Sequence, residues 1–400
     1  MYTKLVRNYS TDISDIVELT VNHNSCFISS WDKSEQILNI DDKLIEQSIH
    51  QQTHKNTYIM SKDMGTLKNK ISSYFDRQGL TISKDNMTIV SNGTSAAFIS
   101  LLQIFKRNAT NFLCIGPIYF TYMHLLDMFK KKLYYYDINL FMETNIDFTI
   151  LQKELIDNNI HCIILIQPFF GSGINLDKSE LKKIISLCEE KNIYLLIDYV
   201  YGNMDWNSIS HIHNPKLIPL ITSSKHCLLY ESISKRIFLN GMKNAIIFGS
   251  SQLINSINID SEICLGSISY IQESLLYTIY SPENLESVNY FITDILTYAS
   301  SNYNLLSTLT LGTDVKLCKS TSGYFTLVAI PKTHFQSSED RDIMKEIYQK
   351  ANVVTIPHSR YYYKLTNHYC FRVNLVIETN KLLSAVQAIL QICSNGRNLL

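Results

Sequence analysis

The chain has 400 residues, which is long enough to bury a sizeable hydrophobic core and suggests two or three domains. Lysine plus arginine equals aspartate plus glutamate at 36 each, so bulk charge gives no basis for binding nucleic acid or an anionic membrane. The nine cysteines are far apart and include no CxxC pair, which predicts reduced thiols and no metal site. With no secretory leader or membrane-length apolar run visible, we expect a cytoplasmic protein.

Short apolar runs alternate with helical patterns between residues 88 and 250. The predicted strands are Met87–Val90, Phe112–Ile115, Leu133–Tyr136, Cys162–Ile166, Tyr194–Ile197, Cys227–Tyr230 and Ala245–Phe248. Continuous runs of Ile, Leu, Val and Tyr are typical of strands buried on both faces. We therefore predict an α/β fold with a mainly parallel central sheet and helices on both of its faces. One of these helices follows Asp177 and Glu180, whose spacing predicts a capping box.

The pattern changes after about residue 282. Residues 282–299 predict a long amphipathic helix, and residues 323–330, 353–357 and 370–376 predict strands separated by helices. This predicts a smaller α+β domain. We expect residues 1–45 to complete that domain, residues 46–285 to form the large domain, and residues 286–400 to form the rest of the small one.

Polar residues that could take part in a chemical reaction follow the predicted strands. Asp198 ends one strand, Tyr201 comes three residues later, and Lys235 follows the next strand. Open α/β sheets bind ligands at the carboxyl ends of their strands, where a lysine can condense with an aldehyde. Taken alone, Lys235 is more simply a solvated surface charge, because short lysine motifs match by chance.

Three further segments follow predicted strands and are expected at the same sheet edge. Gly93, Thr94 and Ser95 follow the first predicted strand and begin a helix, which suits a phosphate. Taken alone, this motif is more simply a helix N-cap. Tyr119 follows the second strand and offers an aromatic plane for a flat heterocycle, although a single tyrosine is usually core or surface. The loop 167–173 follows the fourth strand and includes Phe170.

In order and spacing, these motifs resemble the class I/II aminotransferases, a family of fold type I enzymes that depend on pyridoxal 5′-phosphate. The resemblance runs from about Tyr58 to Val376. It implies that Lys235 binds the cofactor covalently and moves the substrate proton. It also implies that Asp198 keeps the ring nitrogen of the cofactor protonated and that Tyr201 donates to its 3′ oxygen.

The resemblance implies further contacts to the cofactor and substrate. Tyr119 would stack on the cofactor ring, and Arg372 would clamp the substrate α-carboxylate. The phosphate would be held by Gly93, Thr94, Ser95, Ser232, Ser234, Lys243 and, from the neighbouring subunit of a homodimer, Tyr58.

Three positions depart from the family pattern. Lys243 stands where the family usually has an arginine on the phosphate, so a forked donor becomes a point charge. Tyr199 stands where an acid often follows the strand-end aspartate. Phe170 replaces an asparagine that donates to the 3′ oxygen of the cofactor and helps hold the substrate carboxylate.

We therefore expect a cytoplasmic, homodimeric, pyridoxal-phosphate-dependent aminotransferase acting on the α-amino group of an amino acid, with a keto acid as the second substrate. The alternatives are a lyase, decarboxylase or oxidase of the same fold, to which Phe170 would point. A non-catalytic member of the family is a further alternative.

Overall fold

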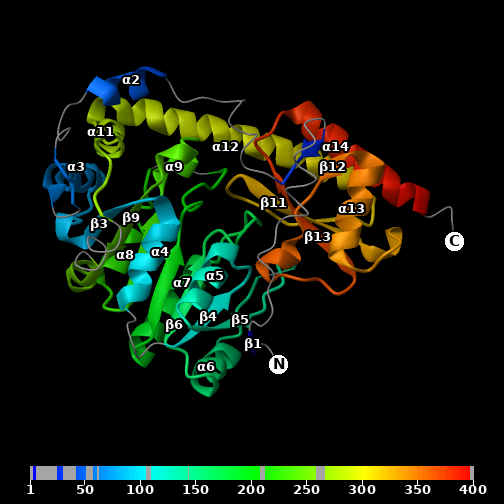
Figure 1. Cartoon of the computed structure of the whole chain (residues 1–400), viewed down its shortest axis with the longest axis horizontal. Coiled ribbons are helices and arrows are strands. Elements are labelled where there is room, and N and C mark those ends of the chain that lie inside the picture. Colours follow the sequence, from blue (N-terminus) through cyan, green and yellow to red (C-terminus); the bar gives the residue numbers. More distant parts are fainter. Residues whose placement is uncertain are drawn as a thin grey trace.

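Two bodies of secondary structure joined by a long helix make up the computed structural model (Figure 1). The structure describes residues 3–5, 25–29, 42–50, 57–60, 63–104, 110–142, 144–207, 212–257 and 266–396. The larger body contains the central sheet, and the smaller one lies at the C-terminal end of the chain (Figure 1).

The central sheet has eight strands in the order β1-β5-β4-β6-β7-β8-β9-β3. Their bounds are β1 Thr3–Leu5, β3 Met87–Ser91, β4 Asn111–Ile115, β5 Lys132–Tyr136, β6 Cys162–Ile166, β7 Tyr194–Asp198, β8 Cys227–Glu231 and β9 Asn244–Gly249. The five strands β5, β4, β6, β7 and β8 are parallel, whereas β9 is antiparallel to both of its neighbours. The seven predicted strands and the mainly parallel sheet are thus confirmed, and β1 is an eighth strand that was not predicted.

Helices cover both faces of the sheet, because successive side chains of each strand point to opposite sides. Helices α4 (Gly93–Ile104) and α5 (Phe120–Met128) pack on one face, where Leu196 and Leu228 point. The other face, where Leu195 and Leu229 point, is covered by helices α3 (Gly65–Asp76), α6 (Phe148–Asp157), α7 (Lys178–Lys191) and α8 (Ile218–Ser223). This arrangement buries the sheet on both sides, as its apolar strands require.

Helix α7 begins where the sequence predicts, but its cap differs from the prediction. The Asp177 carboxylate accepts a hydrogen bond from the Ser179 N–H and caps the helix. Glu180 does not complete a capping box, because its carboxylate accepts a hydrogen bond from the Ile146 N–H at 2.8 Å. The predicted capping box is therefore wrong in its second half, since a tertiary partner takes the Glu180 side chain.

Helix α12 (Pro282–Thr310) runs from the large body to the small one (Figure 1). The small body contains a three-stranded antiparallel sheet in the order β10-β11-β13. Its elements are β10 Lys316–Leu317, β11 Phe325–Pro331, α13 Asp340–Ala351, β12 Val353–Val354, β13 His368–Asn374 and α14 Thr379–Gly396. The predicted connecting helix and the α+β character of this region are observed.

The N-terminal part of the chain contributes to both bodies. Strand β2 (Cys26–Phe27) pairs with β12 in the small body, whereas β1 pairs with β5 at the edge of the large sheet. Helix α2 (Asp42–His50) lies beside α11 (Tyr270–Ile279), which precedes α12 (Figure 1). The domain boundaries drawn from the sequence stay a prediction.

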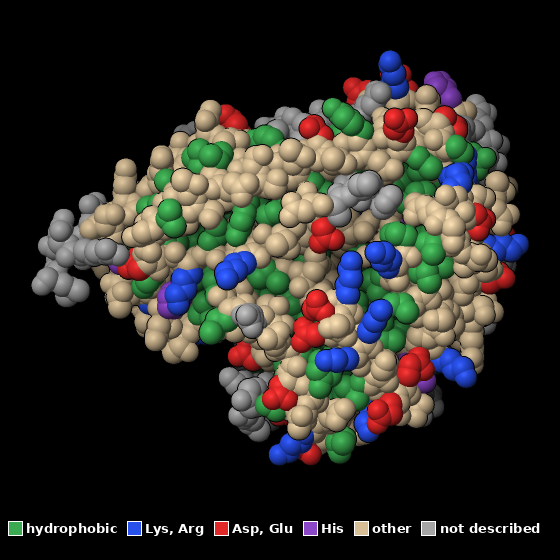
Figure 2. All heavy atoms as spheres, turned by 180° about the vertical axis from the view of Figure 1, so that it is seen from behind, with side chains coloured by type: hydrophobic (Ala, Val, Ile, Leu, Met, Phe, Trp, Pro, Cys, Tyr) green, Lys and Arg blue, Asp and Glu red, His purple; other side chains and the backbone are tan. Residues whose placement is uncertain are grey.

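The surface carries no bias toward one sign of charge on the face seen from behind, where acidic and basic side chains are intermixed (Figure 2). Among the described helices, none is both long and apolar enough to span a bilayer.

Candidate active site

The candidate site is centred on Asp198, the last residue of the parallel strand β7. Its carboxylate is 6% exposed and accepts hydrogen bonds from the Tyr122 hydroxyl at 2.6 Å and from the Val200 N–H at 3.1 Å. Burial raises the pKa of Asp198 to about 6, although both hydrogen bonds oppose this increase. A buried carboxylate of this kind is suited to pairing with a protonated ring nitrogen. The attraction between the two charges would offset the desolvation of the carboxylate.

Lys235 lies on the neighbouring strand's carboxyl end. Strand β8 pairs in parallel with β7, with Tyr230 opposite Asp198, and the short helix α9 (Ile233–Arg236) follows at once. Lys235 is half-buried on this helix. The hydroxyls of Ser232 and Ser234 lie 2.6 Å apart, and both side chains are buried. Lys235 and Asp198 therefore come from adjacent strand ends, as the sequence suggests.

The predicted phosphate site brings two separate turns together. Gly93 is the first residue of α4, and a Cβ at this position would lie 3.8 Å from the Cα of Lys243. The contact follows from the sheet, because β3 and β9 pair and Ser91 lies opposite Asn244. Lys243 is exposed, whereas Thr94 and Ser95 are half-buried. A helix N-terminus, hydroxyls and a lysine make a donor set that suits a phosphate.

Tyr119 and Phe170 form an aromatic wall at the same end of the sheet. Their ring centroids are 5.5 Å apart, and Phe170 also contacts Tyr361 at 4.7 Å and stacks on His358. The Phe170 side chain is 7% exposed. Gly171 adopts a φ of +74°, and a Cβ there would lie 2.8 Å from the His358 ring, so glycine is needed for this turn.

The His358 side chain is hydrogen-bonded to the backbone of the loop that contains Phe170. Its Nε2 lies 3.0 Å from the Phe170 carbonyl oxygen, and the ring is fully buried. Burial, together with the charge of Arg372, lowers the pKa of His358 to about 3, so the imidazole is neutral and Nε2–H donates to that carbonyl. The aromatic wall is thus fixed by its backbone as well as by ring packing.

Arg372, on β13 of the small body, points its guanidinium among three aromatic rings. Its Cζ lies 4.7 Å from the ring centroid of Phe325, 5.4 Å from that of Phe170 and 5.5 Å from that of Tyr361. Its Nε donates to the Ser29 carbonyl oxygen at 3.1 Å. Stacked rings and a hydrogen-bonded Nε fix the direction of a guanidinium, which is the requirement for clamping a carboxylate.

Tyr201 follows β7, three residues after Asp198. Its ring packs edge-on against Tyr324 and Phe325, with centroids 6.5 and 5.7 Å away. Burial raises the pKa of the Tyr201 phenol, and the Arg372 charge opposes that rise, while Tyr119 and Asp198 add to it. The phenol is therefore protonated and is a hydrogen-bond donor at neutral pH.

Tyr58 differs from the other predicted residues. Its side chain is 84% exposed in the single chain, beside Ile59, which forms a bridge with Ile268. The predicted role of Tyr58 needs a second subunit and stays a prediction.

Several residues near the site were not predicted from the sequence. They are Tyr122, which binds Asp198, and Tyr361, Phe325 and His358, which surround Arg372 and Phe170. Tyr122 had a local signal, because it follows Tyr119 by three residues on the same helical turn. The other three come from distant segments, and no sequence pattern connects them to the site.

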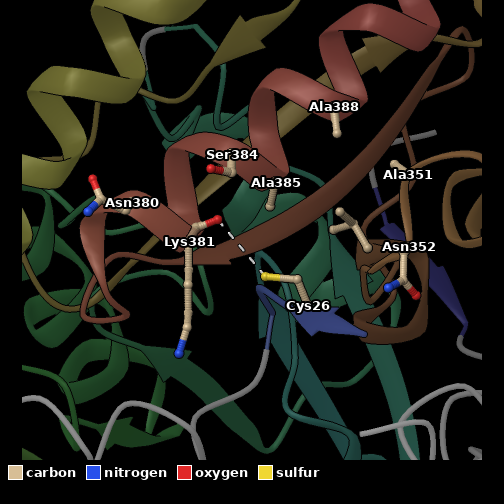
Figure 3. A pocket seen from close by; sticks show the side chains of 9 residues that line it. Cys26, Ala351, Asn352, Asn380, Lys381, Ser384, Ala385 and Ala388 are labelled. Carbon is tan, nitrogen blue, oxygen red and sulfur yellow. Dashed lines mark hydrogen bonds between the residues drawn. The ribbon is translucent and has the colours of Figure 1, made fainter. Parts of the chain in front are cut away.

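A separate surface pocket of about 340 Å³ lies in the small body, between β2, α13 and α14 (Figure 3). Figure 3 shows the Cys26 thiol directed at the Lys381 carbonyl oxygen, 4.0 Å away. The lining is Cys26, Ala351, Asn352, Val353, Asn380, Lys381, Ser384, Ala385 and Ala388. None of the predicted site residues lines this pocket.

The donor set around Asp198 fits pyridoxal phosphate. A buried acid, a lysine, a protonated phenol, an aromatic wall and a helix N-terminus with a lysine match the ring nitrogen, aldehyde, 3′ oxygen, ring face and phosphate in turn. The fold and these groups define a fold type I protein of the pyridoxal-phosphate-dependent class.

Comparison with known proteins identifies the family. Residues 14–389 match the family model for class I and II aminotransferases, and the chain belongs to this family. Tyrosine aminotransferase of Mus musculus is 22% identical over 354 residues, covering 84% of this chain and 73% of that protein. A probable aspartate aminotransferase of Methanocaldococcus jannaschii is 24% identical over 200 residues, so the chain matches only 50% of its length.

Solved structures agree with this fold. An aspartate aminotransferase mutant of Thermus thermophilus superimposes with a TM-score of 0.81 at 13% identity, covering 97% of each chain. The YbdL protein of Escherichia coli, described as having a methionine aminotransferase function, superimposes with a TM-score of 0.78 at 16% identity, covering 97% of this chain and all of YbdL. Members of the family depend on pyridoxal phosphate, and the fold type I architecture predicted from the sequence is confirmed.

Proposed function

We propose that the chain is a pyridoxal-phosphate-dependent aminotransferase that moves the α-amino group of an amino acid to a keto acid. The observation that carries this proposal is the pair of adjacent strand ends: buried Asp198, at the end of β7, is hydrogen-bonded by Tyr122, and Lys235 lies on the short helix α9 that follows β8. Family membership supports the same reading.

Each residue has a distinct task in the proposed reaction. The cofactor, when bound, supplies a ring that accepts electrons from the substrate Cα. Asp198 keeps the proton on the ring nitrogen, and Tyr201 donates to the 3′ oxygen. Lys235 takes the proton from the substrate Cα and returns it to the cofactor carbon. Arg372 orients the substrate by its α-carboxylate, which fixes the bond that is broken.

A second candidate is a lyase, decarboxylase or oxidase of the same fold. The specific observation in its favour is Phe170, whose ring contacts both Tyr119 and Arg372. The family resemblance implies a hydrogen-bond donor at this position. An apolar side chain there changes how the carboxylate is held, and the orientation of the substrate decides which bond breaks. A non-catalytic protein is a weaker candidate, because a scaffold alone needs neither a buried Asp198 nor a directed Arg372.

The experiment is to add pyridoxal phosphate to the purified protein and screen amino acids for spectral change. We expect a yellow protein whose visible absorbance is lost on borohydride reduction. The reduced cofactor should then be found attached to the peptide that contains Lys235. Release of a keto acid from the amino acid, with amino-group transfer to an added keto acid, supports transamination. Carbon dioxide, ammonia or peroxide as the product supports the second candidate. A colourless protein that does not respond to the cofactor refutes both, and Lys235→Ala is the matched control.

We also propose that the protein is a cytoplasmic homodimer in which Tyr58 serves the neighbouring site. The cytoplasm suits the eight described cysteines, because none of them forms a disulfide with another described cysteine. A dimer gives a partner to Tyr58, which is 84% exposed in the single chain. Mixing an inactive Tyr58→Ala variant with an inactive Lys235→Ala variant should restore activity, because one site in the mixed dimer then has both residues. No recovery from subunits shown to exchange would contradict the shared site.

A further inference from the structure

A cluster of buried polar and charged groups is built around Glu231, four residues before Lys235 in the chain. Glu231 is 1% exposed, His213 is 1% exposed and Arg236 is fully buried. The Glu231 carboxylate contacts His213 Nδ1 and lies 3.4 Å from Arg236 Nη2. The other ring nitrogen of His213 lies 2.6 Å from the Tyr280 hydroxyl. Buried charges of this kind are rare, and they are costly unless they are paired.

Glu231 and Arg236 lie on either side of Lys235 in the sequence. Glu231 ends β8, and Arg236 follows Lys235 on α9. Arg236 Nη2 also donates to the carbonyl oxygen of Tyr199, the residue after Asp198, at 3.4 Å. The Arg236 carbonyl in turn accepts a hydrogen bond from the Tyr324 hydroxyl at 3.1 Å. Arg236 is therefore tied to the ends of both β7 and β8 and to the small body.

Helix α9 has little stability of its own. It has four residues, and no side chain caps its N-terminus. A single helical turn in isolation does not form in water, because nucleation costs more than one hydrogen bond returns. Tertiary contacts must hold it, and the ion pair between Glu231 and Arg236 is one of them.

The charge state of Glu231 follows from its surroundings. The ionisable groups around it are Arg236, His213, Tyr199 after β7, Tyr74 on α3 and Tyr280 after α11. Burial tends to raise the pKa of Glu231, but Arg236 and His213 hold that pKa below its ordinary value. Glu231 is therefore ionised at neutral pH and balances the charge of Arg236.

We propose that Glu231 is a positioning residue for Lys235. It neutralises Arg236 and, through that ion pair, holds α9 against the strand ends, so that the Lys235 amine enters the site without an uncompensated cation beside it. The catalytic importance of this role rests on the proposed function, in which Lys235 is the reacting amine.

The test measures the Lys235 amine in the cofactor-free protein. The extent of acetic anhydride labelling is followed against pH by peptide mass spectrometry, which gives a titration midpoint for each lysine. Glu231→Gln leaves the Arg236 cation unbalanced and should lower the Lys235 midpoint by about one pH unit. Arg236→Met leaves the Glu231 anion and should raise the midpoint. The double variant Glu231→Gln/Arg236→Met should return it close to the wild-type value.

Exposed Lys225, just before β8, is the internal control, and its midpoint should stay the same in all four proteins. An unchanged Lys235 midpoint in folded variants with lowered melting temperatures would overturn the proposal, because the cluster would then be only a core ion pair. Shifts in the same direction in both single variants would also overturn it. If Glu231→Gln does not fold, Arg236→Met keeps the Glu231–His213 contact and carries the test. The measurement uses neither cofactor nor substrate, so its failure is distinguishable from failure of the proposed aminotransferase activity.

Discussion

Replacing Asp198 by asparagine should make the cofactor-free protein more stable while it destroys activity. Burial raises the pKa of Asp198 from 3.8 to about 6. At neutral pH that difference corresponds to ~3 kcal/mol of lost unfolding free energy, because the folded protein must keep a buried carboxylate ionised. Asparagine removes this cost but weakens one of the two hydrogen bonds, from Tyr122 or from Val200, at about 1 kcal/mol. We expect a net gain of about 2 kcal/mol.

The stability gained by Asp198→Asn should depend on pH. A carboxyl group whose folded pKa is raised costs nothing below its unfolded pKa, and its full cost is reached above its folded pKa. The cost of ionised Asp198 should therefore fall by about half between pH 7.5 and pH 5, which brings the gain of the variant below ~1 kcal/mol.

The assay is urea unfolding of the cofactor-free proteins at pH 7.5 and pH 5, at equal protein concentrations. Asp177→Asn is the matched control, because this acid is exposed at the start of α7 and asparagine caps a helix equally well. In the loaded enzyme, Asp198→Asn should lower kcat at least about a hundredfold, because a neutral amide cannot hold the proton on the ring nitrogen. A cofactor-free variant that is less stable than wild type at both pH values would refute the reasoning.

Three further substitutions test the neighbouring assignments. Lys243→Arg exchanges one cation on the phosphate for another, so cofactor affinity should stay the same or increase; a kcat loss as large as that of Asp198→Asn would contradict both roles. Phe170→Asn removes a buried ring that packs on Tyr119 and should cost ~3 kcal/mol or more in urea unfolding. It should also lower the pH midpoint of the visible absorbance change by restoring a donor, and an unchanged midpoint would show that Phe170 acts only in packing. Arg372→Lys should lower kcat/KM for the amino acid ~10- to 100-fold, because a point charge replaces a bidentate donor; a value near wild type would place the carboxylate elsewhere.

The sequence predicts the strands well, because strands buried on both faces have an apolar signature that does not depend on their partners. Direction and pairing lack such a signature. The antiparallel direction of β9 and the pairing of β1 with β5 depend on tertiary contacts, which no local pattern encodes. Likewise, Glu180 has the spacing of a capping box, yet its carboxylate binds the Ile146 N–H instead.

In the candidate site too, some residues could be connected from the sequence and others depend on tertiary contacts. Asp198 and Lys235 could be connected from the sequence because both follow buried strands. The surroundings of Arg372 could not, because its Nε partner Ser29 is 343 residues away in the chain. The role proposed for Glu231 could not be predicted from the sequence either, because it depends on the register that pairs β8 with β7 and on the contacts of Glu231 with His213 and Arg236.

The three residues of β1 protect the outer edge of the central sheet. Thr3–Leu5 pair with Tyr134–Tyr136 of β5, which would otherwise present unpaired backbone groups on a strand rich in tyrosine. An exposed edge of this composition is a template for pairing between molecules. Trimming the first five residues, or crowding them with a fusion, should therefore promote aggregation without touching the candidate site. Fusions are better joined after α14, which ends at Gly396.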